Sequence, residues 1–180
     1  QTAPIPGGTL RAGSTPGDAG HTLSPLGEQF LAGLLAHARG MAVCCTPTIN
    51  GFGRFRPNAL APMSVLWGRD NRGAMLRGLG RCGDAATRIE NRIGEPMANP
   101  YLYIAAQIHA GLDGVERALA APPATDAPYA GTAVALPTSL EEALSALEAD
   151  DALARAFGEP LLRCLLQVKR SEVERHAQAS

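Results

Sequence analysis

The chain has 180 residues, of which 46% are hydrophobic and 18% are charged, and its formal net charge is −1. Such a balance leaves no overall field to attract nucleic acid or a membrane surface, and the longest apolar stretches are too short to cross a bilayer. The four cysteines show no C-x-x-C spacing, so we interpret them as reduced cytosolic thiols rather than as a disulfide framework or a zinc site. These features predict a cytoplasmic protein.

The basic residues are unevenly distributed along the chain. Fifteen of the sixteen are arginine, and eight of these lie within residues 54–92, where the only acidic residues are Asp70, Asp84 and Glu90. That window therefore has a local balance of +5. Because arginine is suited to forked recognition of carboxylates and phosphates, the clustering indicates a site for anionic groups.

The first half of the chain predicts a loop, a helix and then strands. Residues 1–22 are rich in Gly, Pro, Thr and Ala without apolar periodicity, which predicts a loop, and we expect it to continue from a missing upstream region. A helix is predicted from Ser24, as N-cap, and Pro25 to near Gly40. The short apolar pieces of residues 41–69 suggest strands and a long functional loop, with a strand at 64–67 and another at 85–93.

The second half is mostly helical. Asn99 and Pro100 predict the start of a helix that reaches about residue 119. Residues 121–137 contain five Pro or Gly and predict a linker. Thr138 or Ser139 forms a capping box for a helix to about residue 149, and a last helix is predicted over about 160–176. This mixture of helices and strands predicts an α+β fold.

The predicted strand at 85–93 carries charges on one face. Alternate residues of a strand share a face, so Arg88, Glu90 and Arg92 point the same way. A carboxylate between two guanidinium groups could hold a divalent cation while the arginines bind anionic oxygens. The alternative interpretation is a solvated edge with a ladder of surface ion pairs.

Five motifs in order decide between these interpretations. They are N-G-F-G-R at 50–54, A-P at 61–62, W-G-R-D-N-R at 67–72, R-I-E-N-R at 88–92, and N-P-Y-L at 99–102 followed by A-G-L-D-G at 110–114. Their order and spacing resemble the second half of the catalytic domain of the glutamine synthetase family. The resemblance implies that residues 23–180 are the C-terminal portion of that domain, with antiparallel strands and flanking helices, and that the family's N-terminal β-grasp domain is absent from this chain.

The resemblance also implies ligands for several residues in and near these motifs. The expected ligands are ATP, Mg²⁺ or Mn²⁺, glutamate, and ammonia or an amine, in a homo-oligomeric ring. The implied roles are binding of the glutamate α-carboxylate by Arg54, catalysis near the transferred phosphate by Arg72, nucleotide binding by Arg77 and Arg88, metal binding by Glu90, and contact with the substrate and γ-glutamyl phosphate by Arg92. Cations around transferred phosphate suit the chemistry of phosphoryl transfer.

One position departs from the family pattern. The family usually has a glutamate just before the Ala-Pro pair, where it helps bind and deprotonate ammonium, whereas this chain has Leu60. An apolar side chain cannot neutralise ammonium, but it can line a pocket for a larger amine. The leading hypothesis is therefore a ligase that joins an amine to the γ-carboxylate of glutamate through γ-glutamyl phosphate. The alternatives are a true glutamine synthetase that uses ammonia, and a non-catalytic sensor or oligomer component.

The family's further metal ligands should lie upstream, and residues 1–22 do not supply them, so we expect this chain alone to be inactive.

The remaining candidates are interpreted as structural. A lone histidine on a helix, such as His37 or His109, is more often packed than a ligand. Cys44 and Cys45 are expected to pack in the core.

Overall fold

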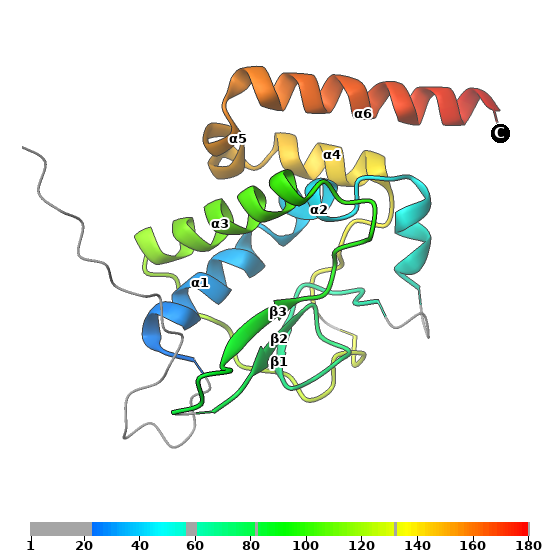
Figure 1. The fold of residues 1–180 in the computed structure, drawn as a ribbon. Coiled ribbons are helices and arrows are strands. Elements are labelled where there is room, and N and C mark those ends of the chain that lie inside the picture. The colour runs from blue at the N-terminus through cyan, green and yellow to red at the C-terminus, as the bar shows by residue number, and fades with distance from the viewer. Residues whose placement is uncertain (1–22, 57–60, 82, 132, 180) are drawn as a thin grey trace, which may run out of the picture.

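The computed structural model describes residues 23–56, 61–81, 83–131 and 133–179. Figure 1 shows a small sheet at one end of the molecule and a long helix at the other, with the remaining helices between them. The elements are α1 (Pro25–Ala36), α2 (Ala38–Cys45), the 3₁₀ helix η1 (Asn50–Arg54), β1 (Trp67–Arg69), β2 (Leu76–Leu79), β3 (Arg88–Asn91), α3 (Pro100–Glu116), α4 (Leu140–Glu148), α5 (Asp151–Phe157) and α6 (Glu159–Ala179).

The helical region begins as the sequence predicts and then differs. The Ser24 hydroxyl accepts a hydrogen bond from the backbone N–H of Gly27 at 3.1 Å, which confirms the predicted N-cap. The helix breaks at His37, and α2 follows where we expected short strands, so that expectation was wrong. Residues 40–46 are all buried, and a helix buried on every side shows no amphipathic period that could distinguish it from a strand.

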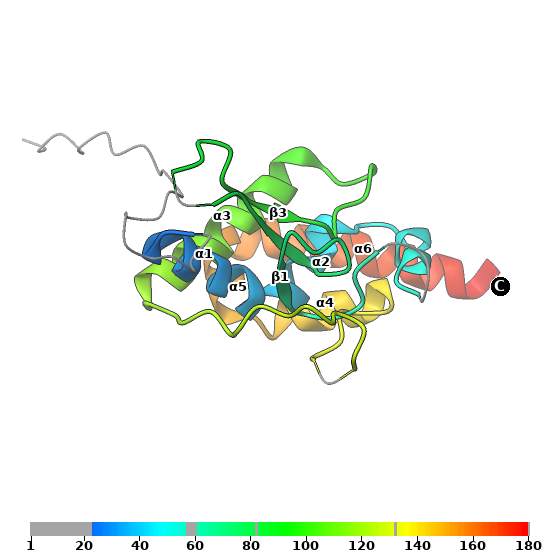
Figure 2. The ribbon, with the colours of Figure 1, turned by 90° about the horizontal axis from the view of Figure 1, so that it is seen from below.

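Helices α1 and α3 touch through their backbones, and Figure 2 shows them side by side as well. A Cβ on Gly33 would lie 2.1 Å from the carbonyl oxygen of Ala110, and one on Gly114 would lie 2.3 Å from that of Gln29. No side chain larger than hydrogen fits at these distances, so the two glycines set how closely the helices approach.

The caps of the later helices match the sequence prediction. The Asn99 side chain accepts from the backbone N–H of Tyr101 at 3.0 Å and starts α3. The Ser139 hydroxyl accepts from the N–H of Glu142 at 3.1 Å and starts α4. Helix α5 was not predicted, because seven residues are too few to show a helical period.

The sheet is mixed and not purely antiparallel. Strand β2 pairs parallel with β1 and antiparallel with β3, and β2 itself was not predicted. The predicted strand at 64–67 is wrong in position, because β1 begins only at Trp67 and Ser64 forms an isolated bridge with Ala135 of the linker. The predicted strand at 85–93 is confirmed in its central part, as β3.

The core lies between the helices and one face of the sheet. Met75, Leu76 and Ile93 from the sheet region are fully buried with the apolar faces of α1, α2 and α4. No helix within the described ranges is both long and apolar enough to span a bilayer. The opposite face of the sheet carries the charged side chains of Arg77 and Glu90, which are paired across β2 and β3.

Candidate functional site

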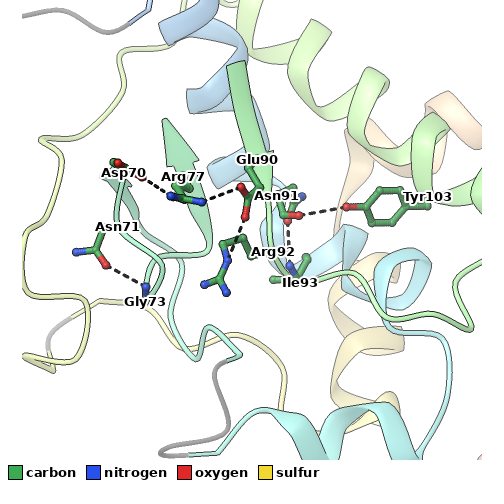
Figure 3. Close-up of polar contacts among 9 residues, drawn as sticks. All are labelled: Asp70, Asn71, Gly73, Arg77, Glu90, Asn91, Arg92, Ile93 and Tyr103. Carbon is green, nitrogen blue, oxygen red and sulfur yellow. Dashed lines mark hydrogen bonds and ion pairs between the residues drawn. The ribbon is translucent and has the colours of Figure 1, made fainter. Parts of the chain in front are cut away.

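Three charged side chains from β2, β3 and the residue that follows β3 meet on that opposite face. Arg77 and Glu90 are directly paired across the two strands. Arg77 Nη1 donates to Glu90 Oε2 at 3.1 Å, and Arg92 Nε lies 3.3 Å from Glu90 Oε1 (Figure 3). We call these three residues the Glu90 cluster. Ile93, next to Arg92 in the sequence, is fully buried on the other side, as the alternation of a strand requires.

The Glu90 cluster is half-buried, and Arg77 is bound by two carboxylates. The Arg77 side chain is 15% exposed and also donates to Asp70, which lies at the open edge of the site. The hydrogen bond to Asp70 raises the pKa of Arg77, burial opposes this rise, and Glu90 adds to it. Arg77 therefore remains cationic, as arginine does throughout the accessible pH range.

Some buried side-chain nitrogens lack an acceptor within the described part of the chain. Nη1 of Arg54 and Nε of Arg77 are the two that concern the site, and they belong to a longer set of such buried side-chain nitrogens. A buried donor without a partner destabilises a protein by about 1–3 kcal/mol, so such atoms mark places where an anionic ligand could bind. Arg54 ends η1, and its guanidinium carbon lies 5.7 Å from the centroid of the Phe55 ring. This ring supports the guanidinium by a cation–π contact.

The other predicted site residues lie apart from the Glu90 cluster. Arg72 is exposed in the turn between β1 and β2, where Asn71 accepts a hydrogen bond from the backbone N–H of Gly73 at 2.9 Å. Arg88 is exposed and donates to the carbonyl of Ala86 at 2.9 Å. Leu60 lies outside the described residues. Among the contacts of the described part of the chain, none joins Arg54, Arg72 or Arg88 to the Glu90 cluster.

The described residues do not complete a metal site. Within the described ranges there is no group of three or more His, Cys, Asp or Glu side chains that could hold an ion. Glu90 contributes one carboxylate, and that carboxylate is already bound by two guanidinium groups. Mg²⁺ requires near-octahedral oxygen coordination, which one carboxylate does not supply.

A second charged cluster, centred on His37, was missed by the sequence prediction. His37 sits at the break between α1 and α2, with Nδ1 2.8 Å from Asp150 Oδ2 and Nε2 2.8 Å from Asp113 Oδ2. Asp150 belongs to the N-cap of α5 and Asp113 to α3, where Arg117 also binds it at 2.8 Å. The three residues are too far apart in the sequence for any spacing rule to join them. The expectation that His37 is packed is confirmed.

The pKa shifts of His37 and Asp113 favour their charged forms. The hydrogen bond with Asp150 raises the pKa of His37, burial opposes the rise, and the bond with Asp113 adds to it. Burial would raise the pKa of Asp113, but the hydrogen bonds from His37 and Arg117 outweigh burial and lower it. The cluster is thus an ion network that holds three helical segments together.

The adjacent cysteines of α2 are core residues. Cys44 and Cys45 are both buried, and burial raises the pKa of Cys44 to about 12. A thiol with so high a pKa carries almost no thiolate at neutral pH, and the thiolate is the nucleophile. The expectation that these residues pack in the core is confirmed.

Comparison with known proteins identifies the fold. Residues 14–180 match the family described as glutamine synthetase, catalytic domain. The chain belongs to the glutamine synthetase family. A solved structure titled as a complex of GmaS with ADP superimposes with a TM-score of 0.80 at 30% sequence identity, over 93% of this chain and 40% of that one. The predicted α+β fold is therefore confirmed.

Three curated relatives show which members of the family the chain is similar to. It is 46% identical over 161 residues to γ-glutamylanilide synthase of Acinetobacter sp, covering 89% of this chain and 32% of that protein. It is 38% identical to glutamine synthetase of Thermus thermophilus, covering 86% and 36%. It is 35% identical to γ-glutamylethanolamide synthetase of Streptomyces coelicolor, covering 86% and 33%. The chain spans about a third of the length of these relatives.

Proposed function

We propose that the protein containing this chain is an ATP-dependent ligase that joins an amine to the γ-carboxylate of glutamate. The observation that carries the proposal is the Glu90 cluster, where two arginines converge on one carboxylate at one face of the sheet. Similarity to two γ-glutamylamide-forming relatives as well as to a glutamine synthetase supports the same reaction class.

The proposed chemistry has two steps. The γ-carboxylate of glutamate attacks the terminal phosphorus of ATP, so that ADP leaves and γ-glutamyl phosphate forms. The amine nitrogen then attacks the acyl carbon, phosphate leaves with the bonding electron pair, and the nitrogen loses a proton. Negative charge accumulates on phosphoryl and acyl oxygens in both steps, and fixed cations stabilise it most where water is excluded.

Each arginine of the site is proposed to bind one of these negatively charged groups. Arg92, which is 18% exposed, is proposed to contact the γ-glutamyl phosphate, and Arg72 to approach the transferred phosphate. Arg77 and Arg88 are proposed to bind the nucleotide phosphates. Arg54, with its buried and unpartnered Nη1, is proposed to bind the α-carboxylate of glutamate.

The metal ion and the oligomeric assembly are further parts of the proposal. The divalent cation, Mg²⁺ or Mn²⁺, would neutralise phosphate charge, and Glu90 is proposed as one of its ligands. The described residues do not supply the others. We therefore expect the isolated chain to show no ligase activity. We also propose that residues 23–180 form the C-terminal portion of the catalytic domain, that the active assembly is a homo-oligomeric ring, and that it is cytoplasmic.

The acceptor can be identified by an assay of the complete protein. Phosphate release is measured with glutamate and ATP, plus ammonium or one of a panel of amines that includes aniline and ethanolamine. We expect at least one amine to give faster turnover than ammonium. Turnover that is fastest with ammonium would identify a glutamine synthetase, and ATP binding without release for any acceptor would support the non-catalytic alternative.

Two substitutions of Leu60 test the role of this position in the same assay. If this position selects the acceptor, Leu60→Glu should increase turnover with ammonium relative to the preferred amine, because a carboxylate can stabilise ammonium. Leu60→Met keeps an apolar side chain of similar volume and should leave the preference unchanged. An unchanged preference in Leu60→Glu contradicts the role of this position.

A further inference from the structure

Glu95, which lies outside the Glu90 cluster, connects the segment before η1 with the segment that follows β3. The carboxylate oxygen Oε1 of Glu95 accepts hydrogen bonds from the backbone N–H of Thr48 at 3.0 Å and from its hydroxyl at 2.9 Å. The backbone N–H of Glu95 donates to the carbonyl of Cys45 at 3.0 Å. The hydroxyl of Thr46 donates to the carbonyl of Ile93 at 2.8 Å. Residues 45–48 are thus bound to residues 93–95 by four hydrogen bonds.

The same carboxylate lies against the backbone of η1. The Thr48 hydroxyl, which donates to Glu95, also accepts from the backbone N–H of Gly51 at 3.0 Å. A Cβ on Gly51 would lie 2.1 Å from Glu95 Oε2. The carboxylate therefore fills the space that a side chain at position 51 would occupy, and a larger residue there would displace it. Three residues later, η1 ends in Arg54.

These contacts connect Arg54 with the Glu90 cluster, between which the described residues show no direct side-chain contact. Glu95 follows Arg92 by three residues, and the backbone N–H of Arg92 donates to the carbonyl of Met75 at 3.0 Å, which fixes this end of the strand to the sheet. Arg54 makes no described contact with the Glu90 cluster. The distance between Arg54 and the cluster is therefore set by the two backbone segments that carry them. Glu95 connects these two segments.

We propose that Glu95 is a positioning residue that holds η1 against the end of β3 and so fixes the separation between Arg54 and the Glu90 cluster. This inference rests on the proposed function. A substrate with two anionic ends, such as an amino acid with a side-chain carboxylate, must meet cations at both ends at once. Small errors in such a separation reduce binding and turnover strongly. Charge-assisted hydrogen bonds are about twice as strong as neutral ones, which suits a carboxylate to this task.

Two variants test the role without removing a charged group from the Glu90 cluster. Glu95→Gln keeps the size of the side chain but removes its charge. Thr48→Val keeps the shape of threonine but removes the hydroxyl that bonds both Glu95 and Gly51. The matched control is Glu142→Gln, because Glu142 likewise accepts from both the backbone N–H of Thr138 at 2.9 Å and its hydroxyl at 3.1 Å, at the start of α4.

Kinetics of the complete protein measure the consequence for substrate. We expect Glu95→Gln and Thr48→Val to raise the KM for glutamate about tenfold or more, while the KM for ATP changes less than about twofold. Glu142→Gln should leave both values unchanged. Equal changes in both KM values, or a change only in Glu142→Gln, would overturn the positioning role.

Hydrogen exchange measures the same contact without activity. In Glu95→Gln the backbone amides of Thr48 and Gly51 should exchange at least about tenfold faster than in the wild type, while amides of α3 remain protected. Unchanged exchange at Thr48 and Gly51 overturns the proposal whether or not the protein is active. If these amides exchange faster in Glu95→Gln but the wild-type protein shows no turnover with any acceptor, the positioning contact stands and the ligase function is rejected instead.

Discussion

Replacement of His37 by leucine should destabilise the fold strongly. The imidazole bridges two carboxylates at 2.8 Å each, and the side chains of Asp113 and Asp150 are only 18% and 12% exposed. Leucine has a similar volume but donates no hydrogen bond. Both carboxylates would therefore remain buried without the donor that now neutralises them.

The size of the stability loss depends on the hydrogen-bond partners that each carboxylate retains. Breaking a buried ion pair by removing one partner destabilises a protein by about 3–5 kcal/mol. Asp113 keeps its contact with Arg117 at 2.8 Å, and Asp150 keeps the N–H of Leu153 at 3.1 Å. We therefore expect the lower end, about 3 kcal/mol. This is a large share of the 5–15 kcal/mol by which a domain is usually stable.

Urea unfolding with tryptophan fluorescence provides the measurement. Trp67 is the single tryptophan and is 6% exposed, so its emission reports loss of the fold. The control is His109→Leu, because His109 contacts the Phe157 ring at a centroid distance of 6.3 Å and makes no ion pair within the described part. A loss below about 1 kcal/mol in His37→Leu, or equal losses in both variants, would refute the reasoning.

The pH dependence provides a second check on the same residue. The folded pKa of His37 is raised above 6.5, so its contribution is complete below 6.5 and is lost as the pH rises through the raised value. The folded pKa of Asp113 is lowered below 3.8, so its contribution is complete above 3.8 and is lost as the pH falls through the lowered value. Stability from this pair is greatest between these limits. In His37→Leu the loss on the alkaline side should disappear.

Three shorter predictions concern other parts of the molecule. Glu90→Gln in the complete protein should raise the Mg²⁺ concentration for half-maximal activity about tenfold or more, whereas Asp70→Asn, at the exposed end of the site, should not. Gly33→Ala should lower the free energy of unfolding by about 1–3 kcal/mol, measured in urea, because its Cβ would meet a backbone carbonyl at 2.1 Å. In a thiol-labelling assay of the native chain, exposed Cys164 should react rapidly and buried Cys44 should not.

The Glu90 cluster could be predicted in part. The period of two along residues 88–92 placed Glu90 and Arg92 on one face, because side-chain direction in a strand follows directly from position. The partner across the sheet could not be found in the same way. Arg77 stands in the short sequence L-R-G-L, which has no strand pattern, and cross-strand pairing depends on a register that only tertiary structure fixes.

Two further features were missed because they join distant segments of the chain. The ion network of His37 and the tie made by Glu95 each connect residues at least 47 positions apart. Neither has a local period or motif of its own. The caps at Ser24, Asn99 and Ser139 were predictable for the opposite reason, since donor and acceptor lie within three residues of each other.

The glycine contact between α1 and α3 has a consequence for the position of His37. Side chains at most helix interfaces lose rotamer freedom on packing, by up to about 2 kcal/mol for long ones, but Gly33 and Gly114 have none to lose. The spacing of the two axes is fixed by van der Waals contact between backbone atoms and not by a choice among rotamers. His37 stands one turn beyond Gly33, and Asp113 immediately precedes Gly114. The two glycines thus keep α1 and α3 close enough for the imidazole of His37 to hydrogen-bond the carboxylate of Asp113.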